Sequence, residues 1–227
     1  MEHKNYGIDL GKERAEQDGT EWKFGSILTS LFKVPESERE KSLPKGEVQR
    51  SNVEDMQDCA TRSPTNELEE QFNYALQNGL LHSDSVNFLE RHEYMEEGRV
   101  VFADAYNAIL SGTTRQGNSL KAPLDTIRKH GMVPKKLLPL LSNMTWEQYH
   151  DPKRITKHIR EIGEEFAKRF TVNYEQVYAS QFKSAMPDGA ICVAAFAWPE
   201  PVNGTYKRVN APPQPCFSPI QERVLRL

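Results

Sequence analysis

Residues 59–79 read CATRSPTNELEEQFNYALQNG and form the clearest helical pattern in the chain. Apolar residues recur there at positions i, i+4, i+7 and i+8, which places them on one buried face of a helix. Ser63–Pro64 is typical of a helix start, with serine as the cap and proline at the first helical position. Asn78–Gly79 is typical of an end. The apolar residues are Leu68, Phe72, Ala75 and Leu76.

Three further helical patterns follow along the chain. They cover Asp104–Leu110, about Ser119 to His130, and a longest stretch from Pro152 to Phe170. We expect Ser111–Gly112 to end the first and Gly131 to end the second, because glycine readily takes the backbone conformation found after a helix.

The pattern changes towards the C-terminus. Ala190–Trp198 is a short apolar run between turn residues, which predicts a buried strand. Asn203–Gly204 predicts a hairpin, with Thr205–Val209 as the returning strand. Helices that come first and strands that come last favour an α+β fold.

Charge and composition exclude several classes of protein. The 227 residues carry 29 Lys+Arg and 32 Asp+Glu, a net charge of −3, with a pI near 6.1. Domains that bind nucleic acid through phosphate contacts usually lie above a pI of about 9, so we expect no nucleic-acid partner. No apolar run reaches the roughly 18 residues of a membrane span. Residues 1–19 lack the apolar region of a signal peptide, so we expect a cytoplasmic or virion-associated protein.

The three cysteines, Cys59, Cys192 and Cys216, do not form a disulfide framework. Their odd number and wide spacing favour a reducing compartment. The spacing also excludes a zinc module of the CxxC type, and we expect neither a metal nor an organic cofactor.

Cys59 is the candidate nucleophile. A thiol at a helix N-terminus lies at the positive end of the helix dipole, which lowers its pKa and favours the thiolate. The alternative is a small buried residue without chemistry, because cysteine is among the most buried residue types.

Residues 1–52 are mostly polar and are interrupted by one apolar patch, Trp22–Phe32. Residues 34–41 read VPESEREK, which predicts a charged linker. Two interpretations remain open: a loosely held arm with one docking segment, or an extension packed on the domain.

Four blocks of sequence resemble papain-like cysteine peptidases, in the order of that family. They span about residues 43–200 and include the catalytic cysteine with its central helix, the loop that lines the substrate cleft, a helix that ends in glycine, and the first strand of the β domain. The blocks are 43–48 (LPKGEV) with 59–63 (CATRS) and 68–69 (LE); 102–106 (FADAY) with 111–112 (SG) and 117–119 (GNS); 124–134 (LDTIRKHGMVP) with 138–139 (LP); and 188–195 (DGAICVAA).

The resemblance implies a papain-like α+β fold with three parts. Residues 1–42 would be a polar arm or pro-like segment, 43–186 the helical half, and 187–227 the start of an incomplete β half. Cys59 would attack a peptide carbonyl and form a thioester. Gln57 would stabilise the oxyanion together with the Cys59 N–H. Gly117 and Asn118 would hold the backbone of a polypeptide substrate.

The chain departs from the family at the base. The motif C-G-[SA]-C-[WY] is absent around Cys59, and no histidine follows His158, although the family places its histidine about 130–150 residues after the cysteine. Three explanations remain open: a truncated or frame-altered peptidase, a pseudopeptidase that binds peptides, or a peptidase that uses another histidine such as His150 or His158. The first two imply low or no activity, and a non-catalytic binding or virion-associated module is the alternative function.

Overall fold

The computed structural model describes Lys12, residues 35–44, 46, 48–172 and 174–177, and three short segments, 200–202, 205–207 and 224–226. The predicted strand Ala190–Trp198 and the apolar patch Trp22–Phe32 lie outside these residues. So do Cys192 and Cys216.

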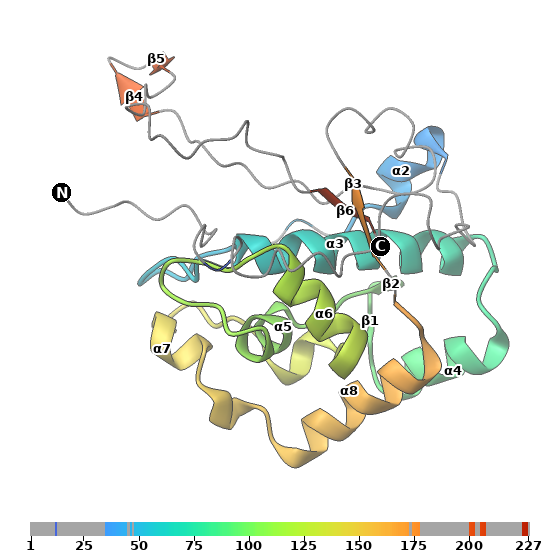
Figure 1. Cartoon of the computed structure of the whole chain (residues 1–227). Helices are drawn as coiled ribbons and strands as arrows, with labels where there is room; N and C mark the ends of the chain where they lie inside the picture. Colours follow the sequence, from blue (N-terminus) through green and yellow to red (C-terminus); the bar gives the residue numbers. More distant parts are fainter. Residues whose placement is uncertain are drawn as a thin grey trace.

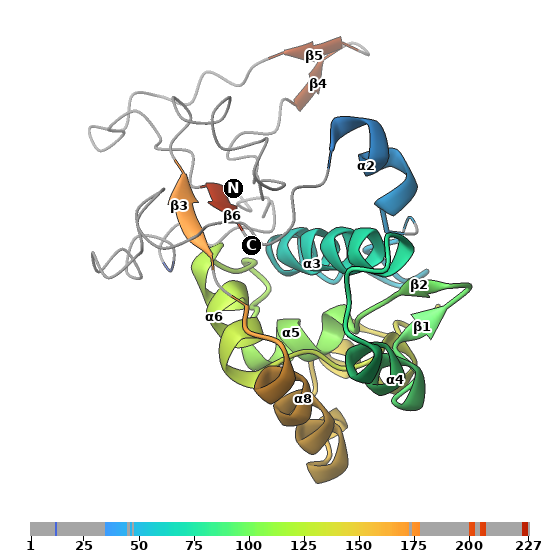
Figure 2. The same cartoon turned by 90° about the vertical axis from the view of Figure 1, so that its right-hand side faces the viewer.

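The described helices surround one long helix, α3 (Cys59–Gln77). This helix crosses the body of the molecule, with α2 (Glu36–Ser42) on one side and α5 (Asp104–Leu110), α6 (Lys121–His130) and α8 (Lys157–Arg169) on the other (Figure 1, Figure 2). The remaining helices are α4 (Ser83–Arg91), α7 (Trp146–Tyr149) and two 3₁₀ turns, Lys135–Leu137 and Pro152–Arg154.

Within the described residues, the strands form three two-stranded antiparallel sheets. β1 (Met95–Glu96) pairs with β2 (Arg99–Val100), and β3 (Glu175–Val177) pairs with β6 (Val224–Arg226). β4 (Glu200–Val202) pairs with β5 (Thr205–Lys207), with Val202 opposite Thr205. This pairing confirms the predicted hairpin, although its two turn residues lie outside the described part.

Two predicted element boundaries are wrong. α3 begins at Cys59, not at Ser63–Pro64, because Asp58 and its buried partners hold the first turn in place; Pro64 lies inside the helix. The expected charged linker at 34–41 is largely helix α2. Its Glu38 and Lys41 side chains pair at 3.1 Å, and it packs on α3 with Ser42 fully buried.

The core beneath α3 is rich in aromatic rings. Phe166 of α8 lies 5.6 Å from Phe72 of α3 and 5.4 Å from Phe102, measured between ring centroids. Tyr94 lies 5.7 Å from Phe166 and donates to the Met132 carbonyl at 2.8 Å. Such ring pairs contribute about 0.5–1.5 kcal/mol each beyond the area they bury.

Buried polar groups of α3 hold the end of β2 and the chain that follows it. Asn73 Oδ1 accepts the Val100 N–H at 2.7 Å, and Glu69 Oε1 accepts the Phe102 N–H at 2.7 Å. These backbone donors are buried, so the side chains of α3 replace the strand partner that they lack.

α6 and α8 approach each other closely at two glycines. Gly131 ends α6 with a φ of 68°, as expected from the sequence, and its backbone meets α8 at Gly163. A Cβ on Gly163 would lie 2.7 Å from the His130 carbonyl oxygen. The helices can therefore cross at this distance only if residue 163 has no side chain.

We predict that Gly163→Ala destabilises the protein by about 1–3 kcal/mol, because the added methyl group forces the two helices apart. Urea unfolding followed by circular dichroism measures the change. Gly46→Ala is the matched control, since nothing lies within 4 Å of a Cβ at that position. Equal stability of the two variants would contradict the close crossing.

Candidate functional site

Cys59 is the first residue of α3, and it is half-buried. Hydrogen bonds from the backbone amides of Ala60 and of Cys59 itself lower the thiol pKa, as expected at a helix N-terminus. Burial, and then the negative charge of Asp58, act in the opposite direction and outweigh them, with a smaller effect from Asp55. The net pKa of Cys59 is raised, so the thiol is protonated at neutral pH and the expected lowering of its pKa is wrong.

A buried ionic network surrounds the start of α3. Arg62 Nε lies 2.9 Å from Asp58 Oδ1, and Arg62 Nη1 lies 2.8 Å from Asp104 Oδ2 at the start of α5. Tyr149 of α7 donates to Asp58 Oδ2 at 2.7 Å. Burial alone would lower the pKa of Arg62, but the carboxylates of Asp104 and Asp58 raise it above its ordinary value. The network therefore joins three helices next to Cys59.

Gln57 lies in the loop before α3, in the left-handed backbone region with a φ of 55°. Its backbone N–H donates to Asp55 Oδ1 at 2.7 Å, and the same oxygen accepts from Gln49 Nε2 at 2.9 Å. The Asp55 carboxylate thus shapes the loop that leads into Cys59. The predicted role of the Gln57 side chain in the oxyanion site stays a prediction.

Gly117 closes a tight turn with Thr114, in which each backbone N–H donates to the carbonyl of the other residue at 2.9–3.0 Å. Its φ of 93° is a conformation that L side chains rarely adopt. The neighbouring Asn118 is fully buried. Its amide Nδ2 donates to Ser111 Oγ at 2.7 Å and to Thr113 Oγ1 at 3.1 Å.

This loop is joined to the helix that carries Cys59. Thr113 Oγ1 lies 3.2 Å from Thr61 Oγ1, in a buried contact one half-turn beyond Cys59. The structure therefore brings the two predicted segments together, the start of α3 and the Gly117–Asn118 loop. The Asn118 side chain lies inside the loop, where its hydrogen bonds to Ser111 and Thr113 hold the loop in place.

The two histidines considered as alternative bases differ in their surroundings. His158 is exposed on α8. His150 is buried and stacks on Trp146, with ring centroids 4.2 Å apart. Burial lowers the pKa of His150, whereas the negative charge of Asp58 raises it. The pKa of His150 therefore responds to Asp58, the residue that adjoins Cys59.

The tautomer of neutral His150 follows from its contacts. Nδ1 lies 3.0 Å from the Trp146 carbonyl oxygen, so Nδ1 carries the proton and Nε2 is the acceptor. Within the described part of the chain, the buried Nε2 has no hydrogen-bond partner. The burial of His150 was not predictable from the sequence, because no local pattern indicates that the Trp146 and Tyr149 rings pack against it.

At the surface, Arg115 connects the loop before Cys59 with helix α7. It pairs with Glu54 at 3.1 Å and with Glu147, and its guanidinium lies 5.0 Å from the Trp146 ring centroid. Arg115, from the loop that follows α5, thus links the loop before Cys59 to helix α7.

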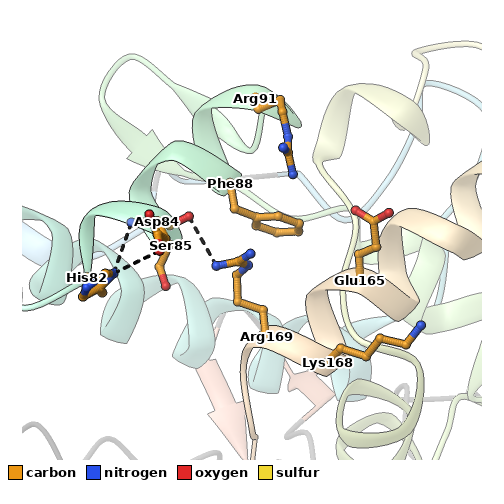
Figure 3. Close-up of a pocket in the computed structure, with 8 residues that line it drawn as sticks. All are labelled: His82, Asp84, Ser85, Phe88, Arg91, Glu165, Lys168 and Arg169. Atoms are coloured by element: carbon orange, nitrogen blue, oxygen red, sulfur yellow. Dashed lines mark hydrogen bonds and ion pairs between the residues drawn. The ribbon is translucent and has the colours of Figure 1, made fainter.

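A separate open groove of about 680 Å³ lies between α4 and α8 (Figure 3). The Arg91, Arg169 and Phe88 side chains gather in its centre (Figure 3), where the Arg169 guanidinium lies 5.0 Å from the Phe88 ring centroid. The groove is lined by His82, Asp84, Ser85, Phe88, Arg91, Glu165, Lys168 and Arg169, and by none of the residues predicted for catalysis.

Comparison with known proteins finds no matching family model, no similar curated protein and no similar solved structure. Among the described residues, no cluster of three or more His, Cys, Asp or Glu side chains is suited to a metal ion. No described helix has both the length and the apolar character that a membrane crossing requires. The papain-like interpretation therefore rests on the residues and geometry of this chain.

We predict that Arg62→Met destabilises the protein by about 3–5 kcal/mol, because it leaves the buried carboxylates of Asp58 and Asp104 without their cation. Chemical denaturation measures the loss. Lys41→Met, which removes an exposed ion pair, should change stability by no more than about 0.5 kcal/mol. Similar losses in the two variants would show that the buried network does not stabilise the fold.

We predict that Cys59 in the folded protein reacts with iodoacetamide with an apparent pKa above the ordinary cysteine value of about 8.5. The cause is burial reinforced by the Asp58 charge, both of which disfavour the thiolate. Peptide mass spectrometry across a pH series measures the rate, and the urea-unfolded chain provides the reference. A folded-state pKa below that of the unfolded chain would overturn the description of the thiol.

Proposed function

We propose that this chain carries the nucleophile-bearing helical half of a papain-like cysteine peptidase and that its partner is a polypeptide. The observation that supports this most is the contact between Thr61 and Thr113. It places the first turn of α3, with Cys59, against the loop that contains Gly117 and Asn118. These are the two segments that such a peptidase uses for attack and for holding substrate backbone.

The chemistry proposed for Cys59 is nucleophilic attack on a peptide carbonyl carbon. The Sγ–C bond forms, the C–N bond breaks, and a proton passes to the departing amine nitrogen. Water then hydrolyses the thioester and releases the acid and the thiol. The Ala60 and Cys59 amides already hydrogen-bond the thiol in the resting protein, so they are placed to favour the thiolate once its proton is removed.

The raised pKa of Cys59 adds a requirement to this proposal. At neutral pH the thiol has to lose its proton to a base when the substrate binds, because burial and Asp58 keep it protonated beforehand. A peptidase normally uses an imidazole for this step. A test that depends on attack by the thiol, and not on complete turnover, therefore examines the site most directly.

The same raised pKa favours a second candidate function, a non-catalytic papain-like module that binds a polypeptide. In such a module, Cys59 is a small, half-buried residue without chemistry that begins α3. The loop braced by Asn118 would still contact an extended chain, and the two functions differ only in whether the thiol reacts.

We predict that a peptidyl vinyl sulfone labels Cys59 at least about tenfold faster than methyl vinyl sulfone. Each 1.4 kcal/mol of peptide binding that persists in the transition state gives a factor of ten. A panel of dipeptide sequences, read by intact-mass and peptide mass spectrometry, measures the ratio.

Cys59→Ser is the control for this experiment: the peptide that carries residue 59 should remain unlabelled, while Cys192 and Cys216 serve as internal references. Equal rates for all the peptidyl reagents and methyl vinyl sulfone would rule out the peptidase proposal. Equal rates together with reversible binding of the same peptides to Cys59→Ser would favour the binding module.

A further inference from the structure

Three oxygen acceptors converge at the loop that follows α5. They are the backbone carbonyls of Ser111 and Gly112 and the side-chain Oδ1 of Asn118. The Lys12 ammonium group lies among them, with Nζ at 2.7, 3.3 and 2.5 Å from the three oxygens in that order. Lys12 is separated from them by about 100 residues of chain. This set of oxygens is called the ammonium cradle below.

The cradle is held in position by the protein itself. Asn118 is fully buried, and its Nδ2 donates to Ser111 Oγ at 2.7 Å and to Thr113 Oγ1 at 3.1 Å. Oδ1 also accepts the Ser119 N–H at 2.9 Å. A flipped amide would lose these bonds and turn its N–H groups towards the ammonium, which has only donors. Asn118 therefore presents its oxygen to a cation.

The chemistry of the cradle fits a primary ammonium group. An ammonium has three N–H donors around one nitrogen, whereas a guanidinium is a flat fork. The cradle oxygens are neutral, while sites for divalent cations in proteins usually include carboxylates. Ser111 is the C-cap of α5 and Gly112 follows it, so both carbonyls lie at the negative end of the helix dipole, which favours a positive charge.

We propose that the ammonium cradle is a binding site for a lysine side chain, that Lys12 occupies it in the resting chain, and that a lysine of a bound polypeptide displaces Lys12. The site itself stands on the contacts of Lys12 and does not require Cys59 to react. Only the identification of the displacing group as a peptide lysine rests on the proposed function.

The position of the cradle makes this assignment relevant to Cys59. Thr113 bonds to Asn118 and also contacts Thr61 in the first turn of α3. A polypeptide bound against this loop would therefore have its lysine anchored next to the helix that carries the thiol. Lys12, from the N-terminal part of the chain, competes for the same place.

The test uses n-butylammonium as the probe and n-butanol as its uncharged control, with the full-length chain. NMR spectra of the Asn118 side-chain amide report binding at the cradle. We predict that Lys12→Met binds n-butylammonium at least about fivefold more tightly than the wild type. If Lys12 leaves the cradle open about one fifth of the time in the wild type, the apparent affinity of the wild type for n-butylammonium is about fivefold weaker than that of the open site.

The matched control is Lys41→Met, which removes an exposed lysine that pairs with Glu38 and should leave the affinity unchanged. Equal affinities of wild type and Lys12→Met, or equal shifts with n-butanol, would overturn the proposal. Reductive methylation of the wild type provides a second measurement. Lys12 should react more slowly than the exposed Lys157, and equal rates would contradict its place in the cradle.

The outcome is separable from that of the vinyl sulfone experiment. Loss of probe binding would leave the labelling of Cys59 intact, because the amine and the electrophile use different atoms. Conversely, an unreactive Cys59 would leave the binding of n-butylammonium to the cradle unchanged.

Discussion

The buried ion pairs of Arg62 hold the start of α3 to the rest of the helical body. Two carboxylates, Asp58 and Asp104, lie within 2.9 Å of one guanidinium, and Tyr149 adds its hydroxyl to Asp58. Burying these charges is costly, and only their mutual pairing offsets the cost. The helix consequently begins at Cys59, and the same Asp58 charge raises the thiol pKa. One network thus sets both the geometry and the resting chemistry of the candidate site.

Further along α3, buried polar side chains accept hydrogen bonds from the neighbouring backbone. Glu69 and Asn73 accept buried backbone N–H groups of the chain beside them, where a helix surface alone would offer no partner. The loop after α5 follows the same principle, since the Asn118 amide satisfies Ser111 and Thr113 from within. Buried polar groups therefore hold the loops around the candidate site in place.

Helix positions were predictable wherever apolar spacing and end signals agreed. Asp104–Leu110 and the end of α6 at Gly131 follow the sequence closely, because both signals are local. The start of α3 was predicted in part: the placement of Cys59 at the helix N-terminus was correct, but the cap signal at Ser63–Pro64 lies inside the helix. Helix α2 was missed because its charged sequence resembles a linker until it packs on α3. Cys59 was found as a candidate from its position, but the direction of its pKa was not.

By itself, the sequence determined the main helices, the hairpin between β4 and β5, and the choice of Cys59 as the residue with possible chemistry. These depend on neighbours within a few turns of the chain. Only the tertiary structure decided that Arg62 pairs with Asp104, that Tyr149 donates to Asp58, and that Lys12 reaches the Asn118 oxygen. The physical reason is that desolvation, electrostatic pairing and a bound ammonium involve residues tens of positions apart, which local patterns do not encode.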